Sequence, residues 1–408
     1  MNLIHFLTGR VTKDAFAKRM VQAFKDRGYQ TVLYDSQQFS IDLGDQESGG
    51  VMFLAHFYAD YCQAPRLRRR PIPGELVDMR IKGLAEEGST APNLERLLPV
   101  IRDLSYAWFC AAQIAATLKD VQHHTSDLQI GDGHRVSLVL DSPTQTQQVT
   151  DQVLTSLNIC FEDGLIQAVK NLRDISPDKW RTIGPGAYVG AWDDTFDCSR
   201  ILLTDVIYRL ELPANPVALI PARGVLLVTS SGSVEGQMAI LQAAKEVIEK
   251  NSRWTSASML ELKDGTWQTY APSAPAVLQL QSELFTRIQF CRYDQQKPLL
   301  ERQLSAQGKD IFVASYFAYE KNKTIFSVAT WSDGVEAWLP KTDYLMFVKP
   351  GAGDTNDIVN VTWDVALSFL SPWMIEVPEV LPVRFHVDEF PDAEMLEALR
   401  AHQTVMGE

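Results

Sequence analysis

The order of the predicted elements is the feature that most constrains the fold of this chain. Helical periodicity over 12–28 is followed by "YQTVLYD" and "QFSIDLG", two alternating runs that predict a hairpin. In the last third, "DIFVASYFAYE", "KTIFSVATWS", "GVEAWLP" and "TDYLMFVKPG" are short runs rich in aromatic and β-branched residues. Helices and hairpins occur in clusters without regular βαβ alternation. The sequence therefore predicts an α+β protein, with helices packed on antiparallel hairpins and a C-terminal aromatic-rich meander.

The length of the chain predicts more than one domain. A single core rarely grows past roughly 250–300 residues, whereas this chain has 408. Breaks in the pattern divide it into an N-terminal helix-plus-hairpin module (1–90), a central α+β domain (91–270) and a C-terminal antiparallel-sheet domain with a helical tail (271–408). Within the first module, the Pro- and Arg-rich segment 63–75 is predicted to be a flexible crossing.

The centre of the chain alternates between helical and strand patterns. Residues 94–120 are predicted to be mostly helical, although Pro99 should end or kink a turn. Two apolar runs within "PVALIPARGVLLVTSS" (216–231) predict a hairpin, and 233–251 predict a helix capped by Ser233. Near the end, "VNVTWDVALSFL" is predicted to be helical.

The charge and the cysteines indicate where such a protein works. The net charge is −13, from 38 basic and 51 acidic residues, and this balance disfavours nucleic acid and anionic lipid. The longest apolar runs fall short of the ~20 residues that span a bilayer, which predicts no membrane association. Five irregularly spaced cysteines without a CxxC pair predict reduced thiols and a cytoplasmic location.

Four phrases occur together in a familiar order. They are "RVSLVLDSPTQTQQVTDQVLTSLNICFEDGLIQAVKNL" (135–172), "DTFDCSRILL" (194–203), "PVALIPARGVLLVTSS" (216–231) and "ATWSDGVEAWLPKTDYLMFV" (329–348). Over roughly residues 94–348, the chain resembles the YtpQ-like family of uncharacterised bacterial proteins. The resemblance implies a bacterial cytoplasmic protein. It brings no reaction, cofactor or functional residue with it.

The candidate ligand-binding residues are Arg223 and Arg200. Arg223 stands in "PARG" between the two predicted strands of the hairpin, where a type I turn would begin at Pro221 and place Gly224 fourth. The planar guanidinium matches carboxylate or phosphate, so Arg223 could hold an anion. An exposed turn arginine, or one paired with a nearby acid, is the simpler interpretation and the favoured one.

The candidate metal ligands are Asp193, Asp194 and Asp197 in "WDDTFD". Three carboxylates within five residues could hold Mg²⁺ or Ca²⁺. However, the spacing fits no EF-hand, and aspartates just before a helix cap its free N–H groups. Capping is the favoured interpretation.

Two further features bear on partners. "RLRRR" (66–70) could dock an acidic partner or, less favourably, RNA, but without interleaved aromatics in an acidic chain it is typical of a solvated loop. Alternation along the aromatic-rich runs should turn some rings away from the core, where they would suit a protein partner.

Two hypotheses about function follow. No phosphate loop, dinucleotide fingerprint or nucleophile motif is present, so no catalytic residue and no cofactor are predicted. The first hypothesis is a non-enzymatic cytosolic protein that binds another protein. The alternative is an enzyme or small-ligand-binding protein for an anionic substrate, phosphorylated substrates included, with a divalent ion at the aspartates. The sequence indicates no oligomeric state.

Overall fold

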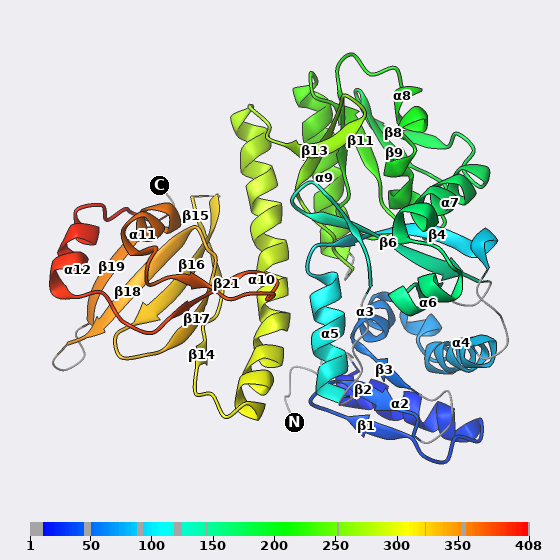
Figure 1. Cartoon of the computed structure of the whole chain (residues 1–408), viewed down its shortest axis with the longest axis horizontal. Coiled ribbons are helices and arrows are strands. Elements are labelled where there is room, and N and C mark those ends of the chain that lie inside the picture. The colour runs from blue at the N-terminus through cyan, green and yellow to red at the C-terminus, as the bar shows by residue number, and fades with distance from the viewer. Residues whose placement is uncertain are drawn as a thin grey trace. The chain divides into compact units, whose positions relative to one another are not determined.

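A computed structural model of the chain describes residues 11–44, 50–87, 93–117, 125–142, 146–250, 253–322, 324–351 and 356–406 (Figure 1). In this part of the chain the strands form five mostly antiparallel sheets accompanied by helices, which confirms the α+β class. None of the helices described there is long and apolar enough to cross a bilayer.

The contacts divide the chain into two compact units. Unit 1 comprises Met1–Val100, Ser137–Pro177 and Glu249–Arg253, and unit 2 comprises Ile101–Val136, Asp178–Ile248 and Trp254–Glu408. The predicted boundary at residue 90 lies outside the described residues. The predicted modules are continuous along the chain, whereas each compact unit combines segments that are separated in sequence. The division into three modules therefore stays a prediction.

Unit 1 begins with the predicted amphipathic helix and hairpin. The helix α2 (Lys13–Asp26) begins after Thr12, whose hydroxyl accepts a hydrogen bond from a backbone N–H. Three fully buried side chains line one face of α2, four residues apart: Phe16, Met20 and Phe24. They pack in one core with an antiparallel sheet of three strands: β1 (Leu33–Asp35), β2 (Ser40–Asp42) and β3 (Val51–Phe53).

The segment 63–75 is largely helical, so its prediction as a flexible crossing was wrong. The helix α3 (Ala55–Gln63) leads into it, and the 3-10 helix η1 (Arg66–Arg68) and α4 (Ile72–Glu87) follow. The prolines that indicated a loop are compatible with this structure, because Pro73 lies in the first turn of α4, where a missing N–H loses no hydrogen bond.

The prediction that 94–120 is mostly helical was wrong in its first part. The 3-10 helix η2 (Leu94–Arg96) is followed by strand β4 (Leu97–Asp103), and α5 (Tyr106–Thr117) begins only afterwards. A short apolar run fits a buried strand as well as a helix. Pro99 is tolerated because β4 lies at the edge of its sheet. The other strands of this sheet are β5 (Leu128–Ile130), β6 (His134–Asp141) and β7 (Thr146–Gln148), and the next helices are α6 (Asp151–Ser156) and α7 (Phe161–Asp174).

The centre of unit 2 is an antiparallel six-stranded sheet with the order β13-β12-β10-β11-β9-β8. Its strands are β8 (Trp180–Gly184), β9 (Ala187–Gly190), β10 (Pro216–Leu219), β11 (Leu227–Ser230), β12 (Met259–Lys263) and β13 (Thr266–Tyr270). The helix α9 (Val234–Lys250) shares a buried core with this sheet. Ser233 caps it as predicted and accepts a hydrogen bond from the N–H of Gly236 at 3.0 Å. The 3-10 helix η3 (Asp197–Leu202) and α8 (Thr204–Tyr208) connect β9 to β10.

The predicted hairpin is present, but its loop is longer than a tight turn. β10 and β11 pair from Pro216–Ser230 to Leu219–Leu227, which leaves 220–226 as the connection. The carbonyl groups of Ile220 and Pro221 accept hydrogen bonds from the backbone of 255–256. The first half of the loop therefore pairs with another segment, and the chain turns at Gly224, whose φ is +75°.

The C-terminal part of unit 2 contains the helix α10 (Pro275–Ala306) and two four-stranded sheets beside it (Figure 1). One sheet has the order β14-β17-β21-β20 and the other β15-β16-β18-β19. The strands are β14 (Phe312–Val313), β15 (Phe317–Lys321), β16 (Thr324–Ser332), β17 (Ala337–Pro340), β18 (Tyr344–Pro350), β19 (Asn356–Thr362), β20 (Ile375–Glu376) and β21 (Arg384–Val387), with helices α11 (Trp363–Leu370) and α12 (Ala393–Arg400).

These sheets differ from a simple meander. β16 pairs with β18 in parallel because the intervening β17 leaves for the other sheet, where it pairs in parallel with β14. The segment "VNVTWDVALSFL" is likewise strand first and helix second, since Thr362 ends β19 and caps α11.

A buried arginine fixes the β14-β17-β21-β20 sheet to α10. Arg384 on β21 is fully buried and donates from Nε to Oε1 of Gln296 on α10 at 2.6 Å. Its Nη1 donates to the carbonyl oxygens of Ala314 at 2.7 Å and Trp338 at 2.9 Å. Burial lowers the pKa of Arg384 to about 10, which leaves it charged at neutral pH.

Candidate functional site

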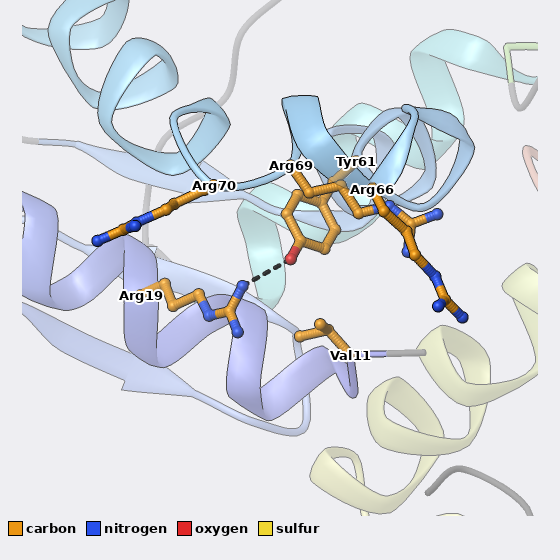
Figure 2. Close-up of a pocket in the computed structure, with 6 residues that line it drawn as sticks. All are labelled: Val11, Arg19, Tyr61, Arg66, Arg69 and Arg70. Carbon is orange, nitrogen blue, oxygen red and sulfur yellow. Dashed lines mark hydrogen bonds between the residues drawn. The ribbon is translucent and has the colours of Figure 1, made fainter. Parts of the chain in front are cut away.

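A pocket in unit 1 is lined by four arginines and one tyrosine (Figure 2). Its volume is about 500 Å³, within the range of small-molecule sites. The residues that line it are Val11, Arg19, Tyr61, Arg66, Arg69 and Arg70. None of these residues is acidic, so the lining carries an excess of positive charge.

Tyr61 forms the buried wall of the pocket. It lies on α3 and packs against Phe16 of α2, with 4.9 Å between the ring centroids. Arg19 extends from the exposed side of α2, one turn after Phe16, and its Nη1 donates to the Tyr61 hydroxyl at 2.6 Å. Because the tyrosine oxygen accepts this hydrogen bond, its own O–H remains able to donate to a ligand.

Arg69 is held in place by the chain that precedes it. Its Nε donates to the carbonyl oxygen of Ala64 at 2.8 Å, and its Nη2 donates to the carbonyl of Cys62. The guanidinium carbon lies 5.8 Å from the centre of the Tyr61 ring, within cation–π range. Arg69 therefore closes the pocket over the tyrosine. Some of its N–H groups already donate to backbone carbonyls.

Arg66 and Arg70 are exposed and extend to opposite sides of Tyr61 (Figure 2). Arg66 belongs to η1, and Arg70 follows it. Two acids of the same unit already have basic partners, because Asp78 is paired with Arg27 and Asp60 with Arg253. The described residues that line the pocket include no carboxylate.

Sequence reasoning noticed "RLRRR" and interpreted it as a solvated loop. The pocket depends on Arg19 and Tyr61 as well, which lie in other helices and carry no local motif. The absence of an interleaved aromatic counted against a site at 66–70, whereas the aromatic ring is supplied five residues earlier by Tyr61. Only the approach of α2 to α3 brings these groups together.

The predicted candidates of the central segment form a tight structural cluster. Arg200 has no exposed surface and makes two hydrogen bonds with Asp194, one to each carboxylate oxygen at 2.7 Å. Its guanidinium carbon also lies 4.5 Å from the centre of the Trp192 ring. Asp197 is buried and accepts hydrogen bonds from the N–H groups of Trp192 and Asp194, each at 3.1 Å. Asp193 is exposed, with a φ of +56°.

Two carboxyl groups of this cluster, the half-buried Asp194 and the buried Asp197, have opposite pKa shifts. Burial alone would raise the pKa of Asp194, but the bonds from Arg200 and the N–H of Phe196 hold it below its ordinary value. Burial raises the pKa of Asp197, and the charge of Asp194 raises it further. In the described part of the chain, no group of three or more histidine, cysteine or carboxylate side chains could hold a metal ion. The prediction of a divalent ion at Asp193, Asp194 and Asp197 thus gains no support.

Arg223 contacts a different partner from Arg200. Its guanidinium carbon lies 4.6 Å from the centre of the Tyr106 ring on α5. Arg200 instead makes its ion pair with Asp194. The predicted ligand-binding pair is therefore divided between two separate sets of contacts.

Comparison with known proteins adds no assignment. Neither the family models, nor the curated proteins, nor the solved structures include a match to this chain. The resemblance to the YtpQ-like family therefore stays a prediction.

Proposed function

We propose that this protein binds a phosphate-bearing small molecule in the arginine pocket of unit 1. The observation that carries the proposal is that Arg19, Arg66, Arg69 and Arg70 line one pocket, and that no acid is among the described residues lining it. Guanidinium groups match phosphate in shape and charge, and charge-assisted hydrogen bonds are about twice as strong as neutral ones. The proposal takes the ligand-binding alternative of the sequence analysis and assigns no reaction.

The size and chemistry of the pocket favour a small ligand over a nucleic acid. A cavity of about 500 Å³ suits a small molecule. The net charge of −13 would oppose an extended polyanion such as RNA, whereas a compact phosphate group needs only a local excess of positive charge. The hydroxyl of Tyr61 adds one neutral donor among the cations, which would help to orient a phosphate oxygen.

The predicted cytoplasmic location agrees with this proposal. All five cysteines are free, as in a protein of a reducing compartment, where phosphorylated metabolites are abundant. Cytoplasmic location and bacterial origin are part of the proposal.

The first prediction concerns the affinity of the full-length protein for inorganic pyrophosphate, measured by isothermal titration calorimetry. We expect Arg66→Gln with Arg70→Gln to weaken pyrophosphate binding and to raise the dissociation constant roughly tenfold for each arginine. The effect is of this size because each exposed cation contributes modestly to the binding free energy. Tyr61→Phe should also weaken binding, since it removes the neutral donor and keeps the ring.

The matched control for this prediction is Arg68→Gln. Arg68 lies in the same 3-10 helix and is exposed, but it does not line the pocket. It changes the net charge by the same amount as Arg66→Gln alone, so long-range electrostatics cancel when these two single variants are compared. Equal weakening by Arg68→Gln and Arg66→Gln, or no pyrophosphate binding by the wild type, would contradict the proposal.

A second candidate function is supported by exposed aromatic rings in the C-terminal part of unit 2. Phe317 and Tyr319 are 45% and 51% exposed, and their ring centroids lie 6.3 Å apart. Both belong to β15, which is at the edge of its sheet. An edge strand offers free backbone groups, and aromatic rings are enriched where proteins bind each other. These features support the predicted protein-interaction role.

The second prediction tests this candidate by capture from a native bacterial cytosol with mass spectrometry. Phe317→Lys with Tyr319→Lys should lose a partner that the wild type retains, because two lysines remove the aromatic contact area. Ile358→Lys is the control, since Ile358 is 41% exposed on β19 at the opposite edge of the same sheet. Recovery of the same proteins by wild type and double variant would exclude this surface.

A further inference from the structure

Two arginines of unit 2 share a single tyrosine ring. The guanidinium carbon of Arg223 lies 4.6 Å from the centre of the Tyr106 ring, and that of Arg102 lies 5.3 Å from it. The three residues come from the β10–β11 loop, from β4 and from the first turn of α5. Each is partly exposed.

The carboxylate next to this cluster is used elsewhere. Asp103 follows Arg102 directly, but its Oδ1 accepts hydrogen bonds from the backbone and hydroxyl of Ser105. The Nη2 of Arg292 on α10 also lies 3.4 Å from the Oδ1 of Asp103. The structure describes no ion pair between Arg102 or Arg223 and a carboxylate among the residues it covers.

The two cations also oppose each other. Burial lowers the pKa of Arg102, and the nearby charge of Arg223 lowers it further. The Nε of Arg102 is buried without a hydrogen-bond partner among the described residues, while its Nη1 donates to the adjacent Ile101 carbonyl at 3.1 Å and its guanidinium also hydrogen-bonds with Tyr106. A buried donor without a partner is costly. An anion between the two arginines would offset their mutual repulsion and would accept a hydrogen bond from the Nε of Arg102.

We propose that Arg102, Tyr106 and Arg223 form a second binding site, separate from the pocket of unit 1, for a small oxyanion group. Phosphate and carboxylate both suit the fork of a guanidinium, so either can supply this group. The ring of Tyr106 holds the two guanidinium planes through cation–π contacts and leaves their N–H edges for the ligand. This arrangement gives Arg223 the anion-binding role that its place in "PARG" first suggested.

The test uses the full chain carrying Arg66→Gln and Arg70→Gln, so that the pocket of unit 1 contributes little. Inorganic phosphate and malonate are titrated separately by calorimetry into this background, with and without Arg223→Gln. We expect Arg223→Gln to weaken binding of the preferred anion at least about tenfold, because it removes one of two charged donors. The stronger of the two titrations identifies the group that the site takes.

A stability measurement separates binding from a structural role. Without added anion, Arg223→Gln should unfold at the same temperature as its parent or higher, since it relieves repulsion. With saturating anion, the parent should gain stability and the variant should not. Arg223→Lys, which keeps the charge and loses the fork, should restore the affinity only in part.

Two results would overturn the proposal. The first is an unchanged dissociation constant for both anions after Arg223→Gln. The second is an absence of binding by the background protein at tens of millimolar of either anion. Neither result bears on the pocket of unit 1, which is tested by Arg66→Gln, Arg70→Gln and their Arg68→Gln control.

Discussion

Replacing Asp194 by asparagine is expected to lower the free energy of unfolding by about 3 kcal/mol, because it removes the carboxylate that forms an ion pair with a buried cation. The guanidinium of Arg200 has no exposed surface and makes both of its 2.7 Å bonds to this carboxylate. We place the effect at the lower end of the range for buried pairs because the side chain of Asp194 is 37% exposed. Chemical denaturation followed by tryptophan fluorescence measures it.

Asp193→Asn is the control for this prediction. Asp193 is adjacent and exposed, with a positive φ that asparagine also adopts, so its replacement should change stability by less than about 0.5 kcal/mol. If Arg200 instead bound a ligand, Asp194→Asn would hardly affect stability and would free the arginine to bind anions more tightly. That outcome would contradict the structural role assigned here.

The second large effect is a loss of stability in mild acid that depends on His134. This side chain on β6 is fully buried, and burial lowers its pKa from 6.5 to about 4. The backbone carbonyl of Ile220 and the charge of Asp103 oppose this shift, and the charge of Arg292 adds to it. Below pH 6.5, His134 therefore binds a proton in the unfolded chain but not in the folded protein. The stability of the folded protein falls as the pH decreases for this reason.

The expected size of this loss is about 2 kcal/mol between pH 7 and pH 5, from the two pKa values and proton linkage. Urea unfolding at a series of pH values in this window measures it, and most carboxyl groups remain ionised there. His134→Gln should remove most of the slope, whatever its effect on stability at pH 7. A variant with the wild-type slope would show that other groups cause the acid sensitivity.

Local signals in the sequence predicted the elements that are defined by their own residues. Phe16, Met20 and Phe24 repeat at helical spacing and are buried as expected, while Thr12 and Ser233 cap their helices. The prediction of a helix failed at 97–103, where an apolar run with a proline is compatible with both a helix and a buried strand. Its strand is selected by pairing with residues about forty positions later, which no local pattern records.

The candidate sites were harder to predict because their residues meet only in space. Arg223 was singled out, but nothing near it in the chain indicates that it shares Tyr106 with Arg102. Arg200 and Asp194 were singled out separately, as a candidate ligand-binding residue and a candidate metal ligand. Their spacing is compatible with a ligand site and with an internal ion pair, and only burial distinguishes the two. The arginines at 66–70 likewise needed Tyr61 and Arg19 to become a pocket.

The interleaved composition of unit 1 has a consequence for how the protein is made. The polypeptide passes from one unit to the other at residues 100, 136, 177, 248 and 253. During synthesis, the first hundred residues leave the ribosome well before the later segments that complete the contacts of unit 1. Residues 101–136, which belong to unit 2, emerge between them. Splitting the gene between residues 101 and 248 would therefore divide both units between the two fragments. Co-expression of such fragments should recover the native protein only where each unit can assemble from its separate segments.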